Sequence, residues 1–158
     1  MTDRAYIDAA LLARVIEAAR QSPRGRRNHN FHANDAAPAN RLLNAVEPGS
    51  YIAPHRHLDP DKDETFVVLR GSFGVVLFDD AGRVTDAQVL RAGGETLGVT
   101  IPAGTYHTLV ALEPGSVIFE AKAGPYRPLA DEERASWAPG EGDPGAADYL
   151  KGLVARFV

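Results

Sequence analysis

The sequence predicts an all-β fold, a small barrel or sandwich built from short strands, with a helix near each end of the chain. Three observations predict it. Between residues 41 and 121, short runs rich in β-branched and aromatic residues follow one another. Turn-forming residues separate these runs, for example Pro48-Gly49 and Pro114-Gly115. The segments outside this region instead carry apolar residues at helical spacing.

Composition limits the classes of site that the chain can hold. Its 158 residues fit one domain, and a hydrophobic share of 44% is ordinary for a globular protein. The absence of cysteine excludes disulfides, thiolate zinc sites, iron–sulfur clusters and a cysteine nucleophile. The net charge of −4, from 17 basic and 21 acidic residues, argues against a nucleic-acid or membrane partner. A metal site must therefore use histidine or oxygen ligands.

A first segment, residues 1–40, precedes the expected barrel. It contains neither an uninterrupted apolar stretch nor a small-residue cleavage site, so we expect no signal peptide and a cytoplasmic location. Residues 8–21 predict an amphipathic helix that Asp8 caps and that ends at Ser22-Pro23. The apolar residues that recur at helical spacing are Ile7, just before this helix, and Leu11, Leu12, Val15, Ile16 and Ala19 within it.

The rest of this segment, residues 23–40, predicts irregular structure because it is rich in Pro, Gly, Asn and Arg and lacks periodicity. Two interpretations are open, a solvated connector or a strap that brings side chains to a binding site. In the second, arginine suits a carboxylate or phosphate, and asparagine suits sugar hydroxyls. The candidate substrate contacts are Arg24, Arg27, Asn28, Asn30 and His32.

Residues 41–123 form the expected barrel, and residues 124–158 an extended arm with one helical turn and a closing helix over 145–157. The barrel strands are predicted over 41–47, 51–57, 65–70, 73–78, 83–90, 96–101, 107–112 and 116–123. The residues between Asp79 and Gly82 predict a hairpin turn. Exposed barrel edges and two added helices lead us to expect a homodimer.

Two histidines share one expected strand. His55 and His57 are two residues apart, so both imidazoles project from the same face, which Tyr51 shares. Two buried imidazoles are costly to desolvate, and a shared metal ion would compensate that cost. Tyr51 carries a hydroxyl that needs a partner, which makes it a candidate ligand contact. The alternative interpretation is a pair of exposed surface histidines.

Glu64 and His107 complete a candidate metal site. Glu64 lies at the start of the next strand, and His107 follows a turn that contains Pro102 and Gly104. Three neutral imidazoles and one carboxylate suit one divalent transition metal (Zn, Fe, Mn, Ni or Co) and leave positions for water or substrate. His29 is interpreted instead as a loop residue.

The spacing of these residues resembles the two motifs of the cupin superfamily. The matching residues are Gly49, His55, His57, Glu64 and Gly71 in the first motif, and Pro102, Gly104 and His107 in the second. The resemblance covers roughly residues 41–121. It implies one barrel of the double-stranded β-helix type, also called a jelly roll. In such a barrel, three histidines and one glutamate point inward onto one metal.

The gap between His57 and Glu64 departs from the cupin pattern. The six residues 58–63 are more than the family usually has at this point. We expect them to bulge as a loop, which keeps Glu64 in place as the carboxylate ligand. Asp61 or Asp63 remains an alternative ligand.

The flanks of the barrel carry a closer resemblance. Residues 22–32, residues 41–57 and the arm that begins at Gly124 are similar to the WbuC-type cupin-fold metalloproteins. Members of that group are associated with bacterial surface-polysaccharide gene clusters. The resemblance implies a small polar or anionic ligand, such as a sugar or sugar nucleotide, and an isomerase- or epimerase-like reaction. An iron-dependent dioxygenase and a non-catalytic, metal-anchored carbohydrate- or carboxylate-binding module remain alternatives.

Overall fold

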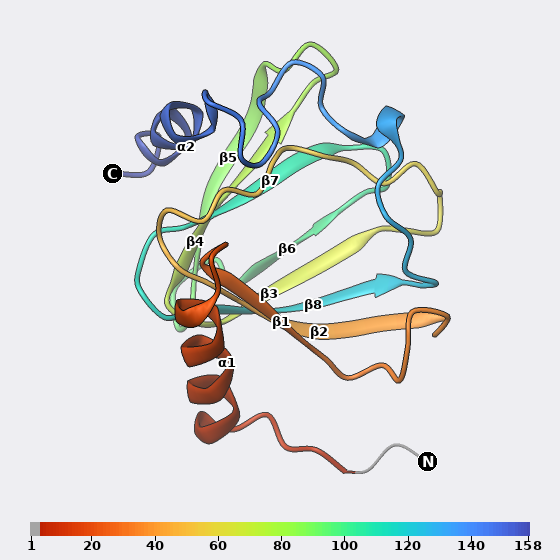
Figure 1. The fold of residues 1–158 in the computed structure, drawn as a ribbon, viewed down its shortest axis with the longest axis vertical. Helices are drawn as coiled ribbons and strands as arrows, with labels where there is room; N and C mark the ends of the chain where they lie inside the picture. Colours follow the sequence, from red (N-terminus) through yellow and green to blue (C-terminus); the bar gives the residue numbers. More distant parts are fainter. Residues whose placement is uncertain (1–3) are drawn as a thin grey trace.

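The computed structural model describes residues 4–158, which form two antiparallel β-sheets with a helix against each (Figure 1). The strands are β1 (Arg26–Asn30), β2 (Ala39–Val46), β3 (Glu64–Arg70), β4 (Ser72–Phe78), β5 (Val84–Arg91), β6 (Gly98–Ile101), β7 (Tyr106–Ala111) and β8 (Ser116–Ala123). The helices are α1 (Ala9–Gln21), α2 (Ala146–Val154) and a short 3-10 turn, η1 (Asp131–Glu133). Within residues 4–158, no helix is long and apolar enough to cross a membrane.

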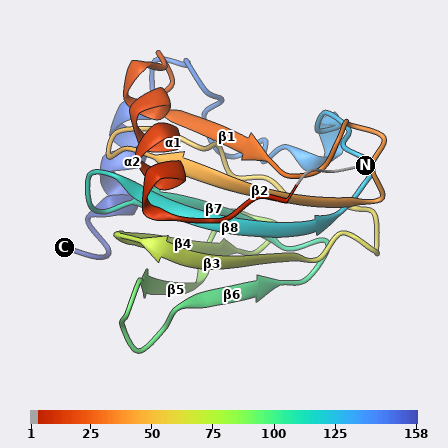
Figure 2. The same ribbon diagram turned by 90° about the horizontal axis from the view of Figure 1, so that it is seen from below.

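The larger sheet has the strand order β1-β2-β8-β3-β6, which can be followed from top to bottom in Figure 2. All of its pairings are antiparallel. The third strand, β8, has a partner on both sides, and its Glu120 lies opposite Leu42 of β2 and Phe66 of β3. The side chains of β8 that face inward are therefore held in the middle of the sheet.

The smaller sheet has the order β5-β4-β7, and its hairpin confirms the turn predicted after β4. The backbone of Asp79 donates to the Arg83 carbonyl at 2.9 Å, and the Asp79 carboxylate accepts from the backbone N–H of Ala81 and of Arg83. Gly82 has a φ of 84°, a left-handed conformation that glycine adopts without strain.

The barrel core lies between the two sheets, and each helix covers one outer face. The inner cluster comprises Val46, Phe66, Val68, Phe73, Val75, Leu90, Ile101, Leu109, Ala111 and Ile118. The predicted first helix is confirmed as α1, with the Asp8 carboxylate accepting from the Leu11 N–H at 2.8 Å. Val15 and Ile16 of α1 pack on the larger sheet against Leu43.

The predicted closing helix is confirmed as α2, and it covers the smaller sheet against Val76 and Val110. Just beyond α2, the Phe157 ring lies directly over Gly74 of β4. A Cβ atom at position 74 would lie 2.3 Å from this ring. The backbone of β4 can approach the ring this closely only because position 74 has no side chain.

Residues 26–30, predicted to be irregular, form the strand β1, so this prediction was wrong. Asn28 lies opposite Asn44, and His29 opposite Leu43. Polar composition concealed the strand because β1 is the edge of the sheet, where hydrogen bonding to one neighbour outweighs a low β-propensity.

The strand predicted over residues 51–57 is reduced to two isolated bridges at His55, one to His107 of β7 and one to Arg134 of the C-terminal arm. The backbones of His55 and His107 exchange two hydrogen bonds, of 3.2 and 2.9 Å. Pro54 has no N–H to continue a ladder, and the Arg56 N–H donates to Glu133 of the C-terminal arm instead. The segment is extended, but it runs between β7 and the arm and belongs to neither sheet.

Candidate metal centre

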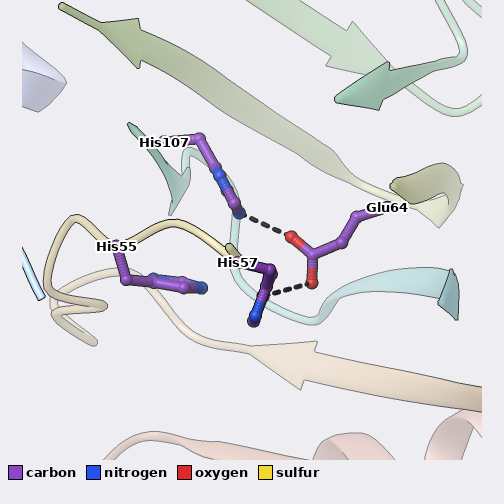
Figure 3. A group of neighbouring side chains, drawn as sticks. All are labelled: His55, His57, Glu64 and His107. Atoms are coloured by element: carbon purple, nitrogen blue, oxygen red, sulfur yellow. Dashed lines mark hydrogen bonds and ion pairs between the residues drawn. The ribbon is translucent and has the colours of Figure 1, made fainter. Parts of the chain in front are cut away.

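Four side chains from three parts of the barrel converge at one point (Figure 3). His55 and His57 come from the extended segment before β3, Glu64 from the first residue of β3, and His107 from β7. One possible ligand atom from each residue lies within 4.8 Å of the others. The fold therefore brings together the same four residues that the motif spacing singled out.

The backbone sets the orientation of two of the imidazole rings. The Nδ1 atom of His55 lies 3.0 Å from the Ala53 carbonyl oxygen, and that of His107 lies 2.9 Å from the Thr105 carbonyl oxygen. Because a carbonyl oxygen only accepts, Nδ1 carries the proton in both rings. In the neutral form of either ring, Nε2 is therefore the unprotonated atom, and this is the form in which imidazole binds a metal.

The contact between Glu64 and His107 indicates that a cation belongs here. The Oε2 atom of Glu64 lies 2.6 Å from the Nε2 atom of His107. Both atoms are buried, and neither has a hydrogen-bond partner within the described residues. A nitrogen and an oxygen this close need either a proton or a metal ion between them. One divalent metal ion would satisfy both atoms, so the residues fit the kind of metal predicted.

Burial and charge set the protonation states that metal binding needs. Burial, together with the neighbouring His107, lowers the pKa of His55 to about 3, so that this ring is neutral at physiological pH. Burial alone would raise the pKa of Glu64. Its contacts with His107 and His57 and the charge of Lys122 outweigh burial and hold that pKa well below its usual range.

Two further ionisable side chains, both on β8, lie beside the four. Lys122 Nζ lies 2.8 Å from Glu64 Oε1 and 3.3 Å from His57 Nε2. Burial lowers the pKa of Lys122, but the charges of Glu64 and Glu120 outweigh it and raise this pKa. Burial, and next the charge of Glu64, raise the pKa of the Glu120 carboxyl to about 7.

A cavity of about 470 Å³ opens beside this cluster. Its apolar wall includes Ile52, Phe66, Leu109 and Ile118. Its polar lining comprises Ser22, Arg24, Arg26, Arg27, Asn28, Asn44, His55, Glu64, His107, Thr108, Glu120 and Lys122. The volume suits a small molecule, and four cationic side chains against two carboxylates favour a polar or anionic one.

Residues 23–40, interpreted either as a solvated connector or as a strap at a binding site, reach the cavity with only some of their side chains. Arg24, Arg27 and Asn28 are among the lining residues, and Asn30 and His32 are not. The His32 Nδ1 atom accepts from the backbone N–H of Arg41 at 3.3 Å.

Tyr51 lies away from the cavity. Its hydroxyl donates to the Pro139 carbonyl at 2.7 Å, and its ring packs edge-on against Tyr149 of α2. Tyr51 was expected on the face of His55, but residues 51–57 are not a regular strand, so strict alternation does not hold between these positions. The hydrogen-bond partner of the Tyr51 hydroxyl is therefore a carbonyl of the C-terminal arm and not a ligand.

The carboxylate beside the histidines is Glu64. Asp63 accepts instead from the Ala103 N–H at 2.8 Å, and Asp61 is exposed. Residues 58–63 loop out of the barrel as expected, and Lys62 anchors the loop by donating to the Ala123 and Pro125 carbonyls.

Sequence reasoning missed Arg26, Asn44, Glu120 and Lys122 as cavity residues. For the last two a signal was present. Ile118 is an apolar position of the barrel interior, and Glu120 and Lys122 follow it at steps of two, which places all three on one face of a strand. Charged residues on an inward face indicate a site rather than a core.

The chain was compared with protein-family models, with curated proteins and with solved structures. The family model described as a domain of unknown function (DUF6016) matches residues 7–90, more than half of the chain. No curated protein matches the chain. Many chains of solved structure do match it.

Among these is KdgF from Halomonas sp., with 23% identity and a TM-score of 0.52 over 68% of this chain and 85% of that one. An oxalate oxidase in complex with the substrate analogue glycolate has 16% identity and a TM-score of 0.54, over 87% and 75%. A conserved protein of unknown function from Streptococcus pyogenes has 13% identity and a TM-score of 0.50, over 67% and 80%. These likenesses show the fold, which is the cupin jelly roll with an added helix at each end.

Proposed function

We propose that this chain, which belongs to the family of the domain of unknown function DUF6016, is a metal-dependent enzyme that acts on a small polar or anionic molecule. One observation carries the proposal. His55, His57, Glu64 and His107 converge, the Nδ1 atoms of His55 and His107 contact backbone carbonyls and leave Nε2 for a metal, and three of the four residues line a cavity of small-molecule size. The substrate class that we propose is a sugar or sugar nucleotide.

The reaction that we propose is of the isomerase or epimerase type. A bound divalent ion would act as a Lewis acid on a carbonyl or hydroxyl oxygen of the substrate. Glu120 lies in the same cavity and carries a carboxyl group that can take up or release a proton. Lys122 supplies a positive charge beside the cluster, where negative charge would develop on that oxygen. These two side chains favour an enzyme over a module that only binds.

The proposal extends to the biological role, the oligomeric state and the division of the chain into segments. The resemblance to WbuC-type proteins supports a role in bacterial surface-polysaccharide biosynthesis in the cytoplasm. The open edge strands support a homodimer, which light scattering would test by giving a mass of about twice that of one chain. The arrangement of the chain as an N-terminal segment (1–40), a cupin barrel (41–123) and a C-terminal arm (124–158) is part of the same proposal.

Metal content is the first test. We expect about one first-row transition metal ion per purified chain by elemental analysis. The double variant His55→Ala/His57→Ala should lose the metal and keep its circular dichroism spectrum. His29→Ala is the matched control, because this histidine lies outside the cluster, and it should keep the metal. Metal retained by the double variant would refute the site.

Product analysis separates the reaction types. Metal-loaded protein is incubated in D₂O with a panel of sugars, sugar nucleotides and sugar acids. An isomerase or epimerase incorporates deuterium next to a carbonyl, which mass spectrometry detects, whereas a dioxygenase consumes oxygen when loaded with Fe(II). Binding seen by thermal shift without either change would support the binding module and contradict the proposed reaction.

A further inference from the structure

Two of the arginines that line the cavity, Arg24 and Arg26, already bind a carboxylate of the chain itself. Arg24 donates from Nε and Nη2 to the two oxygens of Glu141, at 2.6 Å each, and Arg26 donates from Nη2 to Oε2 at 2.8 Å. Such forked contacts are the geometry with which guanidinium groups recognise carboxylates and phosphates. Both arginines line the cavity, and Glu141 comes from the C-terminal arm.

We propose that Arg24 and Arg26 form an oxyanion-binding subsite in the lining of the cavity, which a carboxylate or phosphate group of the ligand enters by replacing Glu141. The subsite rests on the proposed function in one respect, that the ligand also reaches the metal centre. Arg24 and Arg26 line the same cavity as His55 and His107, so one small molecule bound there can contact both groups. The ligand would then carry its anionic group at the end farther from the metal.

The guanidinium of Arg26 is held in place by contacts other than the one with Glu141. The side chain of Arg26 is only 12% exposed, and its Nη1 donates to Ser50 Oγ at 3.1 Å and to the Tyr51 carbonyl at 3.2 Å. These bonds do not involve Glu141, so they persist when the carboxylate leaves. A guanidinium that is positioned in advance loses little entropy when it binds a new anion.

The Glu141 side chain can move away from the two arginines. The side chain of Glu141 is 39% exposed, and within residues 4–158 its hydrogen bonds go to Arg24 and Arg26 alone. Gly140 and Gly142 flank it, and Gly142 has a φ of 85°. The loop itself is anchored by the Tyr51 hydroxyl, which donates to the Pro139 carbonyl, and is closed across Glu141 by the Gly140 N–H, which donates to the Asp143 carboxylate. The side chain can therefore swing into water while the loop stays in position.

Glu141 competes with any incoming anion because it is itself charged. Its hydrogen bonds from Arg24, which outweigh its burial, lower the pKa of Glu141 to about 2. Replacing this carboxylate with a neutral amide of the same shape removes the competitor and leaves both arginines. Glu141→Gln should therefore bind an external oxyanion more tightly than the unchanged protein does.

Calorimetric titration with inorganic phosphate and, separately, with succinate tests the subsite. The variants are made in the His55→Ala/His57→Ala background, so that the anion cannot bind through a metal. We expect Glu141→Gln to bind at least one probe about tenfold more tightly than its parent. Adding Arg24→Ala, a residue whose side chain is 59% exposed, should abolish the gain. Glu95→Gln, the same charge change at an exposed site, is the control.

Each outcome decides something. A gain with phosphate alone indicates a phosphorylated ligand, a gain with succinate alone a carboxylate, and a gain with both a general oxyanion site. No gain in Glu141→Gln, or a gain that survives Arg24→Ala, overturns the subsite. Metal content is measured in parallel on the chain with intact histidines. If Glu141→Gln gains anion affinity but the chain with intact histidines contains no metal, the proposed function alone is refuted. If that chain contains metal but Glu141→Gln gains no anion affinity, the subsite alone is refuted.

Discussion

The interior of the barrel has an apolar half and an ionisable half, and the same strands build both. On β3, Val68 belongs to the apolar cluster, whereas Glu64 lies beside the histidines. On β8, Ile118 belongs to the apolar cluster, whereas Lys122 contacts Glu64. Four residues along either strand separate the two environments, and β7 changes in the same way between Leu109 and His107.

The two halves contribute to the free energy of folding with opposite sign. Burying apolar side chains stabilises the fold by about 25 cal/mol per Å² of surface removed from water. Burying charged groups costs free energy, which their mutual attraction only partly returns. The apolar half should therefore determine stability, and the ionisable half should be tolerated for what it binds. Three variants test this division.

The largest effect is expected in the apolar half. Phe73 is 0% exposed and belongs to the inner cluster. Phe73→Ala should lower the free energy of unfolding by about 3–5 kcal/mol, because it removes buried surface and leaves a cavity. Urea denaturation followed by circular dichroism measures it. Protein that remains folded should still bind metal, and loss of metal from the folded fraction would contradict the division.

The ionisable half should respond in the opposite direction. Glu64→Leu combined with Lys122→Met replaces a buried ion pair with apolar side chains of similar size. In the absence of metal, the double variant should be as stable as the unchanged protein or more stable by about 1–4 kcal/mol. Its metal content should fall to background. A marked loss of stability in metal-free urea denaturation would show instead that these charges hold the barrel together.

The last effect is a pH dependence that comes from Glu120. Its pKa is about 7 in the folded protein, above the usual value of 4.5, so the folded state holds a proton that the unfolded state releases between these two values. The stability associated with that proton is complete below pH 4.5 and is lost as pH rises toward 7.

Glu120→Gln removes this titration. The metal-free variant should match the unchanged protein near pH 4.5 and exceed its stability by up to about 3 kcal/mol near pH 7.5, since each unit of pKa shift corresponds to about 1.4 kcal/mol. Urea midpoints at the two pH values measure the difference. Glu95→Gln, at an exposed position, should show no such dependence. A constant difference across the range would mean that Glu120 titrates normally.

Much of the fold could be predicted because the apolar half follows simple rules. Alternating apolar residues and glycine-containing turns indicated the strands β2 to β8, and helical spacing with the Asp8 cap indicated α1. Those signals are local, since each depends on a few neighbouring residues. The edge strand β1 was missed because its pairing with β2 is made by the backbone and leaves no apolar pattern.

The candidate site was predicted in part, for a related reason. The motif spacing indicated His55, His57, Glu64 and His107, and the structure brings them together. Tyr51 was assigned by alternation, which fails where the chain leaves the sheet. The contact between Arg24 and Glu141 joins residues 117 positions apart in the sequence, so no local pattern could indicate it.

The Phe157 ring over Gly74 links two distant positions of the chain into one shared volume. An alanine at position 74 has no room while the ring is in place, and a smaller residue at position 157 leaves β4 uncovered. Each change alone should be unfavourable, but Gly74→Ala together with Phe157→Leu should recover part of the loss, a non-additive coupling of the kind expected for residues in contact. Among relatives of this chain, we therefore expect the residue at one of these positions to restrict which residues are acceptable at the other.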